Sequence, residues 1–126
     1  MTTVVRAGAG RRLTLPGRTA TELVSRAEGG YAVTVRRVTI PPEAASEPRG
    51  PHRHDGCEEV IAVLGGAGTF ITDDGAWPVS AGDVVVVSPG EPHRTRNTGT
   101  TDLVILCFFP VPDLPSVTTD LPGPAR

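Results

Sequence analysis

Hydrophobic residues occur in short runs along the chain, and glycine, proline or paired aspartates separate one run from the next. Short runs rich in Val, Ile, Thr and Phe that are bounded by turn residues are typical of β-strands, and apolar and polar positions alternate clearly within residues 11–15 and 31–35. The pattern predicts strands at residues 2–6, 11–15, 21–25, 31–40, 59–64, 67–72, 76–79, 84–87, 93–97 and 103–109. No segment has the period of an amphipathic helix. The chain is therefore expected to be all-β, a sandwich or barrel of antiparallel strands.

Two of the predicted strands have unusual patterns. Residues 84–87 are four consecutive valines, as expected of a strand that is buried on both faces. Within residues 31–40 the apolar positions change from one face to the other. That change predicts a β-bulge near Arg36 and Arg37.

The two ends of the chain differ from its middle. We expect residues 1–16 to form an N-terminal arm, residues 20–110 a β-barrel, and residues 111–126 a proline-rich tail without regular structure. An arm of this length cannot bury itself alone. It is expected to pair with an edge of the barrel or with a partner subunit, and the arm together with an exposed sheet face predicts a homodimer.

Composition restricts the function further. The 126 residues suffice for one domain, and the net charge of −2 offers no electrostatic footprint for nucleic acid. The sequence contains no lysine, which excludes Schiff-base chemistry. Cys57 and Cys107 form no C-x-x-C pair, and no secretory leader or membrane-length apolar run is present. We expect a reduced cytoplasmic protein without a membrane or nucleic-acid partner.

The three histidines provide the clearest chemical signal. His52 and His54 are two residues apart, so on an extended chain their side chains project from the same face. A nearby carboxylate and an imidazole from another strand, such as His93, would complete a mixed nitrogen and oxygen site. Such a donor set suits a first-row divalent metal.

The spacing of these residues resembles that of the cupins. The two motifs of that family are G-x5-H-x-H-x3,4-E-x6-G and G-x5-P-x-G-x2-H-x3-N. The matching positions here are His52, His54, Glu59, Gly66, Gly82, Gly90, His93 and Asn97. The sequence departs from the motifs at Ser46, where they have Gly, and at Ser88, where they have Pro. Both departures fall in loops.

The resemblance implies a double-stranded β-helix, a jelly-roll barrel with a metal in its mouth. It implies one divalent metal ion per chain, Fe, Mn, Ni, Zn or Co, with Fe preferred. The implied ligands are His52, His54, Glu59 and His93. The adjacent Glu58 fits a shorter allowed spacing and is the alternative carboxylate ligand, because neighbouring residues on a strand face opposite ways.

Other residues near the motifs receive less specific predictions. Thr95 and Asn97 share the face of His93, so both are candidates for lining a substrate pocket, although Asn97 equally suits a loop hydrogen bond. Ile61 and Phe70 are further pocket candidates, with a core position as the alternative for Phe70. Three side chains are expected to have no role at the metal: Arg53 and Arg94 as solvated charges, and Cys57 as a loop thiol.

The resemblance implies three classes of function, each with a small organic molecule as partner. Two open coordination positions on Fe would permit dioxygenase chemistry, which we prefer. A different metal would act as a Lewis acid in a cyclase or isomerase. The third class is a non-catalytic binding protein. In an enzyme, Glu59 would be the catalytic group that takes up a proton, which requires its pKa to be raised toward neutrality.

Overall fold

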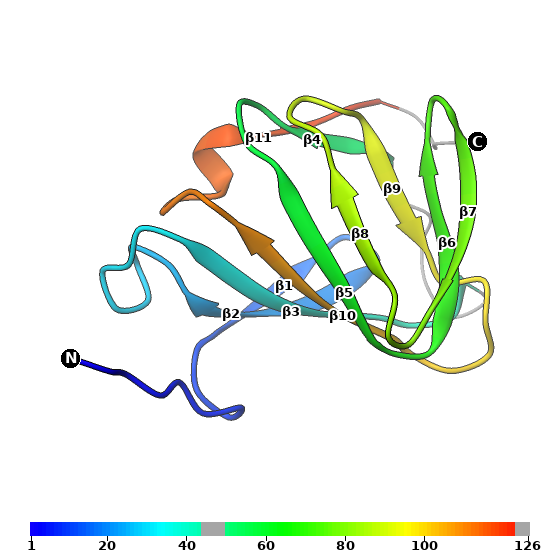
Figure 1. The fold of residues 1–126 in the computed structure, drawn as a ribbon. Helices are drawn as coiled ribbons and strands as arrows, with labels where there is room; N and C mark the ends of the chain where they lie inside the picture. The colour runs from blue at the N-terminus through cyan, green and yellow to red at the C-terminus, as the bar shows by residue number, and fades with distance from the viewer. Residues whose placement is uncertain (44–49, 123–126) are drawn as a thin grey trace.

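Two antiparallel sheets make up the protein in the computed structural model, which describes residues 1–43 and 50–122 (Figure 1). The six-stranded sheet has the order β1 (Arg11–Leu15), β2 (Arg18–Val24), β3 (Thr34–Ile40), β10 (Leu103–Phe109), β5 (Glu59–Gly65) and β8 (Val84–Val87). The five-stranded sheet has the order β11 (Thr118–Asp120), β4 (His52–His54), β9 (His93–Arg96), β6 (Ala67–Thr72) and β7 (Gly75–Ser80). The prediction of an all-β jelly roll is confirmed. Ser46, which belongs to the first motif, lies outside the described residues.

The core lies between the two sheets and follows from alternation along the strands. In β10, Leu103, Ile105, Cys107 and Phe109 point inward and are buried, whereas the residues between them are more exposed. Each fully buried aliphatic or aromatic side chain contributes about 1.5–3 kcal/mol relative to an exposed one. The two sheets are therefore held together largely by these inward-facing rows.

Gly66 turns the chain from one sheet to the other. It lies between β5 of the first sheet and β6 of the second, with a φ of 81°. A Cβ atom at this position would lie 2.4 Å from the carbonyl oxygen of Asp102. Any other residue would clash with that backbone, so the motif glycine is required by the corner itself.

Regular structure at the chain ends differs from the prediction. No strand forms at residues 2–6, and residues 1–10 are exposed. Ala7 stays near the sheet, where its carbonyl oxygen accepts from Arg37 on β3, and the N-terminus extends away from the barrel (Figure 1). The prediction of an irregular tail is wrong between Pro115 and Asp120, where the short 3-10 helix η2 (Pro115–Val117) leads into β11. Residues 116–121 contain no proline, so β11 can pair with the edge of β4.

The predicted bulge lies in a different strand. Strand β3 pairs with β10 without interruption, whereas its pairing with β2 shifts register between Glu22 and Val24. The extra residue is therefore Leu23, opposite the step from Val35 to Arg36. The sequence therefore predicted the bulge at the correct level of the sheet, next to Arg36, but assigned it to β3 instead of to the neighbouring strand β2.

The four valines of β8 are buried on one face only, so that prediction is wrong for the single chain. Val87 is buried, whereas Val84 and Val86 are 60% and 62% exposed. Strand β8 forms the edge of its sheet, and in the described chain no element covers its outward side. The valine run has the sequence of a strand that is buried on both faces, but in the described chain only its inward face is covered.

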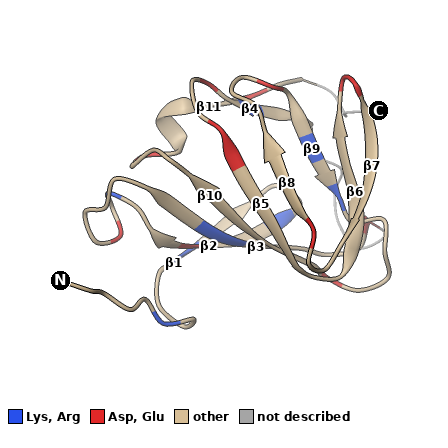
Figure 2. Cartoon of the chain, viewed as in Figure 1, with Lys and Arg blue, Asp and Glu red and all other residues tan. Residues whose placement is uncertain are grey.

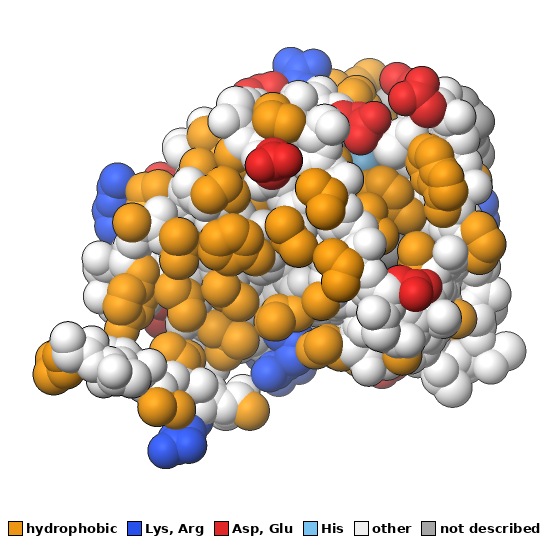
Figure 3. All heavy atoms as spheres, viewed as in Figure 1, with side chains coloured by type: hydrophobic (Ala, Val, Ile, Leu, Met, Phe, Trp, Pro, Cys, Tyr) orange, Lys and Arg blue, Asp and Glu red, His pale blue; other side chains and the backbone are white. Residues whose placement is uncertain are grey.

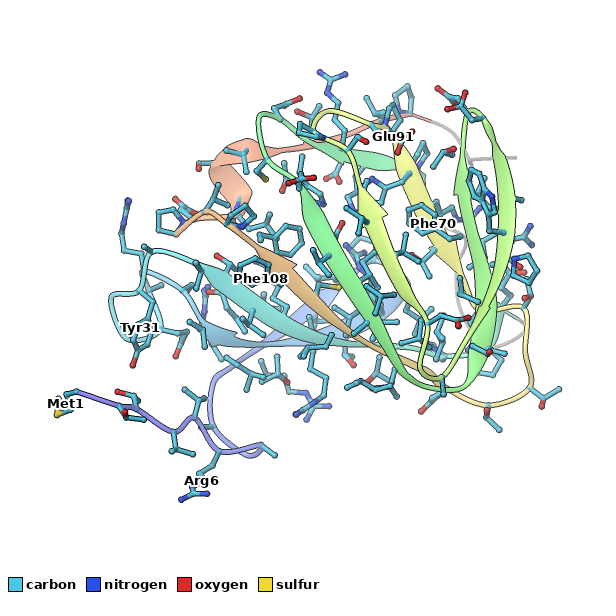
Figure 4. The ribbon with its side chains drawn as sticks, in the orientation of Figure 1. Met1, Arg6, Tyr31, Phe70, Glu91 and Phe108 are labelled. Carbon is cyan, nitrogen blue, oxygen red and sulfur yellow. The ribbon has the colours of Figure 1, made fainter. Side chains whose placement is uncertain are left out.

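An apolar outer face extends from β8 across the neighbouring strands. Val86 lies opposite Val60 in β5, Val60 opposite Phe108 in β10, and Phe108 opposite Val35 in β3. Directly paired residues share a face of the sheet. Figure 3 shows hydrophobic side chains gathered over these strands, and Phe108 is labelled in Figure 4. We call the outward side of β3, β10, β5 and β8 the outer face.

Charged residues of both signs are spread over separate elements (Figure 2). Basic segments occur on β3 and β9, and acidic ones lie on β5 and in several turns, so neither sign collects along a single stripe of the ribbon. Among the described residues, no helix has the length and apolar character needed to cross a membrane.

We propose that a second copy of the chain covers the outer face, as the sequence predicted. In that case Val86→Arg, which places a charge on the apolar outer face, should raise the dissociation constant of the dimer at least tenfold. Light scattering at micromolar concentration measures this. Ser80→Arg, on the exposed side of β7, is the control and should leave the mass unchanged. An unmodified protein with the mass of a monomer would contradict the proposal.

Candidate metal centre

Four side chains converge between the two sheets. His52 and His54 lie on β4 and His93 on β9 of the five-stranded sheet, and Glu59 begins β5 of the other sheet. His52 and His93 are direct partners in the register of β4 and β9. Each residue offers one ligand atom, and all four atoms lie within 4.8 Å of one another.

The two adjacent glutamates differ in burial. Glu59 is 4% exposed and faces the imidazoles, whereas Glu58 is exposed to solvent. Alternation along β5 causes this difference, because only one of two neighbours can face the barrel interior. Only Glu59 is placed to complete the ligand group.

Hydrogen bonds fix the orientation of His54. The hydroxyl of Thr118 donates to the carbonyl oxygen of Leu114 at 2.9 Å, so its only proton is used there. It therefore accepts from Nδ1–H of His54 at 3.0 Å. This leaves Nε2 of His54 without a proton, as an electron-pair donor directed into the barrel. Sequence analysis missed Thr118, although the β-branched residues 117–119 were a signal for a strand.

His93 is held in the same tautomer by a different partner. Its Nδ1–H donates to the carbonyl oxygen of Glu91 at 2.9 Å, because a carbonyl can only accept. The backbone N–H of Gly90 donates to the carbonyl oxygen of His54 at 2.8 Å. The second motif is thereby anchored to the first motif, and Nε2 of His93 also points inward.

Three buried acceptors consequently face one another without a donor. Nε2 of His54 and Nε2 of His93 lie 3.3 and 3.0 Å from the same oxygen, Oε1 of Glu59. None of these three atoms has a hydrogen-bond partner in the described chain. Buried acceptors that converge in this way are satisfied by a cation, and imidazole nitrogens with a carboxylate form a suitable donor set for a divalent metal. The residues present therefore fit a bound divalent metal ion.

The ionisation of Glu59 agrees with a ligand role. Burial by itself raises the pKa of this carboxyl group. When His54 and His93 carry a second proton on Nε2 in place of a bound cation, their hydrogen bonds and positive charge outweigh burial and hold the pKa of Glu59 well below its ordinary value. The catalytic role expected for Glu59 requires the opposite shift. A carboxylate that stays ionised is better suited to bind a metal than to take up a proton at neutral pH.

The four candidate ligands line a cavity of about 70 Å³. Ile61 and Thr95, two of the pocket candidates, line it. Arg18 and Arg36 also line it, and sequence analysis missed both. Alternation along the strand could have indicated Arg18, because it lies two residues from the buried Ala20 and therefore shares the inward face of β2. We call this cavity the metal pocket.

The other two pocket candidates lie outside the metal pocket. Asn97 donates from Nδ2 to the carbonyl oxygens of Ile40 and Thr101, both at 2.8 Å, and accepts from the N–H of Gly99 at 3.0 Å. It holds a loop, which was the alternative prediction. Phe70 packs behind His93, with ring centroids 5.7 Å apart, and belongs to the core (Figure 4).

The remaining predictions near the site had mixed outcomes. Arg53 is 40% exposed and pairs with Asp55. The expectation of a solvated Arg94 is wrong, because its side chain is 7% exposed and its guanidinium lies 3.8 Å from Glu43. Arg94 lies on β9, which is flanked by β4 and β6 within its sheet. Cys57 is a free buried thiol whose pKa is raised by burial and by Glu59, so it is a poor nucleophile.

Comparisons with known proteins agree with this geometry. The family model described as a cupin domain matches residues 36–109. An oxalate-binding protein from Thermotoga maritima is 39% identical over 73 residues, a match that covers 58% of this chain and 58% of that protein. The chain thus matches little more than half the length of that relative.

Solved structures match over a larger part of the chain. The crystal structure of a predicted oxalate decarboxylase from Thermotoga maritima has a TM-score of 0.71 and 28% identity, and the match covers 86% of this chain and 99% of that one. Bacillus subtilis oxalate decarboxylase, in a structure described for its Mn(II) centers, has a TM-score of 0.71 at 20% identity. That match covers 87% of this chain and 29% of the other, and at this identity it reports the fold alone.

The unsatisfied acceptors give a test in the metal-free protein. In Glu59→Gln, the new amide N–H can donate to Nε2 of His54 or His93, so the metal-free protein should melt roughly 5 °C higher. Mn(II) should raise the melting temperature of the unmodified protein, and the same variant should lose that rise. Thermal denaturation with and without Mn(II) measures both effects. Glu58→Gln is the control, and equal behaviour of the two variants would refute the assignment.

The hydrogen bond to His54 gives a second test. Thr118→Val keeps the shape of the side chain and removes the acceptor for Nδ1–H, so His54 loses its fixed tautomer. The dissociation constant for Mn(II) should rise about 10–100-fold. Thr119→Val, which removes an exposed hydroxyl on the next residue, should have no effect on metal affinity. Calorimetric titration with Mn(II) compares them, and equal affinities would show that Thr118 does not position the ligand.

Proposed function

Because the chain belongs to the cupin-domain family, we propose that it is a metal-dependent cupin that binds a small carboxylate at a divalent ion. The observation that carries this proposal is the group of three buried acceptors, Nε2 of His54, Nε2 of His93 and Oε1 of Glu59, that lack any donor in the described chain. His52, His54, Glu59 and His93 would hold the ion. When bound, it would supply Lewis acidity and open coordination positions for an anionic ligand.

The character of the pocket supports an anionic ligand. Arg18 lines the metal pocket together with Arg36, whose charge is paired with Glu22, and Thr95 adds a hydroxyl. Guanidinium groups bind carboxylates through paired N–H donors. The Thermotoga maritima relative is an oxalate-binding protein, so oxalate is the appropriate first probe.

For the metal, the donor set itself accepts any of the first-row divalent ions named from the sequence. Iron was preferred there because of dioxygenase chemistry. The Bacillus subtilis enzyme has Mn(II) centers, and we therefore propose Mn(II) as the first metal to load.

Binding is favoured over catalysis by the residues around the pocket. Decarboxylation of a carboxylate substrate breaks a carbon–carbon bond, and a nearby group must then supply a proton to the carbon that loses carbon dioxide. Among the described residues that line the metal pocket, Glu59 is the only one with a carboxyl group, and the metal would use it as a ligand. No described residue favours oxygen-dependent chemistry, a cyclase or an isomerase over binding.

The test is a calorimetric titration of oxalate into three samples: the Mn(II)-loaded protein, the metal-free protein, and His93→Ala treated with Mn(II). Oxalate should bind the loaded protein at least tenfold more tightly than the other two, because the ion supplies most of the attraction. Metal content measured on the same samples controls for loading. Equal affinity in the loaded and metal-free protein, or no binding to either, would contradict the proposal.

A further inference from the structure

A second and larger cavity adjoins the metal pocket. It has a volume of about 680 Å³ and lies between β1, β2 and β3 on one side and the segment of η2 and β11 on the other. The residues that line both cavities are Leu15, Arg18, Arg36, Leu114 and Thr118. We call the larger cavity the outer chamber.

The outer chamber has the size and lining of a small-molecule site. Pockets for small organic ligands measure about 300–1,000 Å³. The outer chamber falls in that range, whereas the metal pocket at about 70 Å³ is far below it. Most of the wall is apolar, with Leu13, Leu15, Leu114 and Leu121 among its residues.

Of the two arginines at the junction, Arg36 is already neutralised. Its guanidinium lies 2.9 Å from Glu22, whose carboxylate also accepts from Arg11 at 3.0 Å and from the hydroxyl of Ser25 at 2.8 Å. Burial alone would raise the pKa of Glu22, but these hydrogen bonds and the charge of Arg36 outweigh it and lower the pKa. Glu22 therefore stays ionised and occupies Arg36.

Arg18 differs from Arg36 in this respect. Its guanidinium donates to the carbonyl oxygen of Pro16 at 2.8 Å. The carboxylates of Asp120 and Glu59 attract it at longer range, but no described carboxylate lies within ion-pair distance of it. A guanidinium has five N–H donors and stays charged at any physiological pH. Arg18 therefore offers N–H groups and a positive charge where the two cavities meet.

We propose that the ligand is a carboxylate with an apolar chain, larger than oxalate, that occupies both cavities at once. This inference rests on the carboxylate-binding function proposed above. The carboxylate head lies in the metal pocket, where Arg18 binds it, and the apolar chain lies against the leucines of the outer chamber. A 2-oxo acid with an aliphatic chain has this chemistry.

A series of ligands with one head and growing chains tests the inference on the unmodified protein. Pyruvate, 2-oxobutanoate, 2-oxohexanoate and 2-oxooctanoate are titrated calorimetrically into the Mn(II)-loaded protein, with oxalate as the reference. Each buried methylene should raise affinity about fourfold. We expect 2-oxooctanoate to bind at least 50-fold more tightly than pyruvate and more tightly than oxalate.

Two pairs of variants locate the parts of the ligand. Leu13→Trp fills the outer chamber and should lower the affinity for 2-oxooctanoate at least tenfold, whereas Thr14→Trp, on the exposed side of β1, should not. Arg18→Gln should weaken every carboxylate in the series about tenfold or more. Its control, Arg12→Gln, removes the same charge from an exposed position outside both cavities.

The outcomes separate this inference from the proposed function. Binding of oxalate without any gain along the series would overturn the inference and leave carboxylate binding intact. A gain that is equal in Leu13→Trp and Thr14→Trp would also overturn it, because the chain would then lie elsewhere. Absence of binding by every carboxylate to the metal-loaded protein would refute the proposed function itself. Since the series uses the unmodified protein, the test holds even if Leu13→Trp does not fold.

Discussion

The constraint on which the structure depends is the meeting of Oε1 of Glu59 with Nε2 of His54 and of His93 between the two sheets. Burying an ionised carboxylate beside two lone pairs costs several kcal/mol unless a cation compensates. The three acceptors come from β5 on one sheet and from β4 and β9 on the other. A cation at this point would therefore link the two layers as well as complete a ligand site.

The hydrogen bonds around this centre explain why distant segments matter to it. The hydroxyl of Thr118 fixes the tautomer of His54, and it can do so only because β11 pairs with β4. Thr118 also lines both the metal pocket and the outer chamber. The C-terminal segment consequently sets the orientation of a ligand atom and, at the same time, forms a wall of the space beside it.

Of the two arginines that line the metal pocket beside the buried Glu59, only Arg18 has no described carboxylate within ion-pair distance. Glu22 neutralises Arg36 within the wall of the barrel, whereas Arg18 has no described carboxylate at ion-pair distance. In a partly desolvated cavity a guanidinium without an ion-pair partner produces a strong local field that favours anions. Under the proposed function, the same barrel would combine a site for a cation with a neighbouring site for an anion, which is the arrangement that a metal-bound carboxylate needs.

The sequence by itself determined the local features of this protein. Short apolar runs between turn residues located strands such as β6, β8 and β10, and motif spacing brought out His52, His54, Glu59 and His93 together with Gly66. The tertiary structure alone decided that Arg18 and Thr118 reach the metal pocket, that Asn97 holds a loop, and that β8 is an edge strand. The physical reason is range. Side-chain periodicity reports which face a residue occupies on its own strand, whereas pairing between strands distant in sequence decides what lies opposite that face.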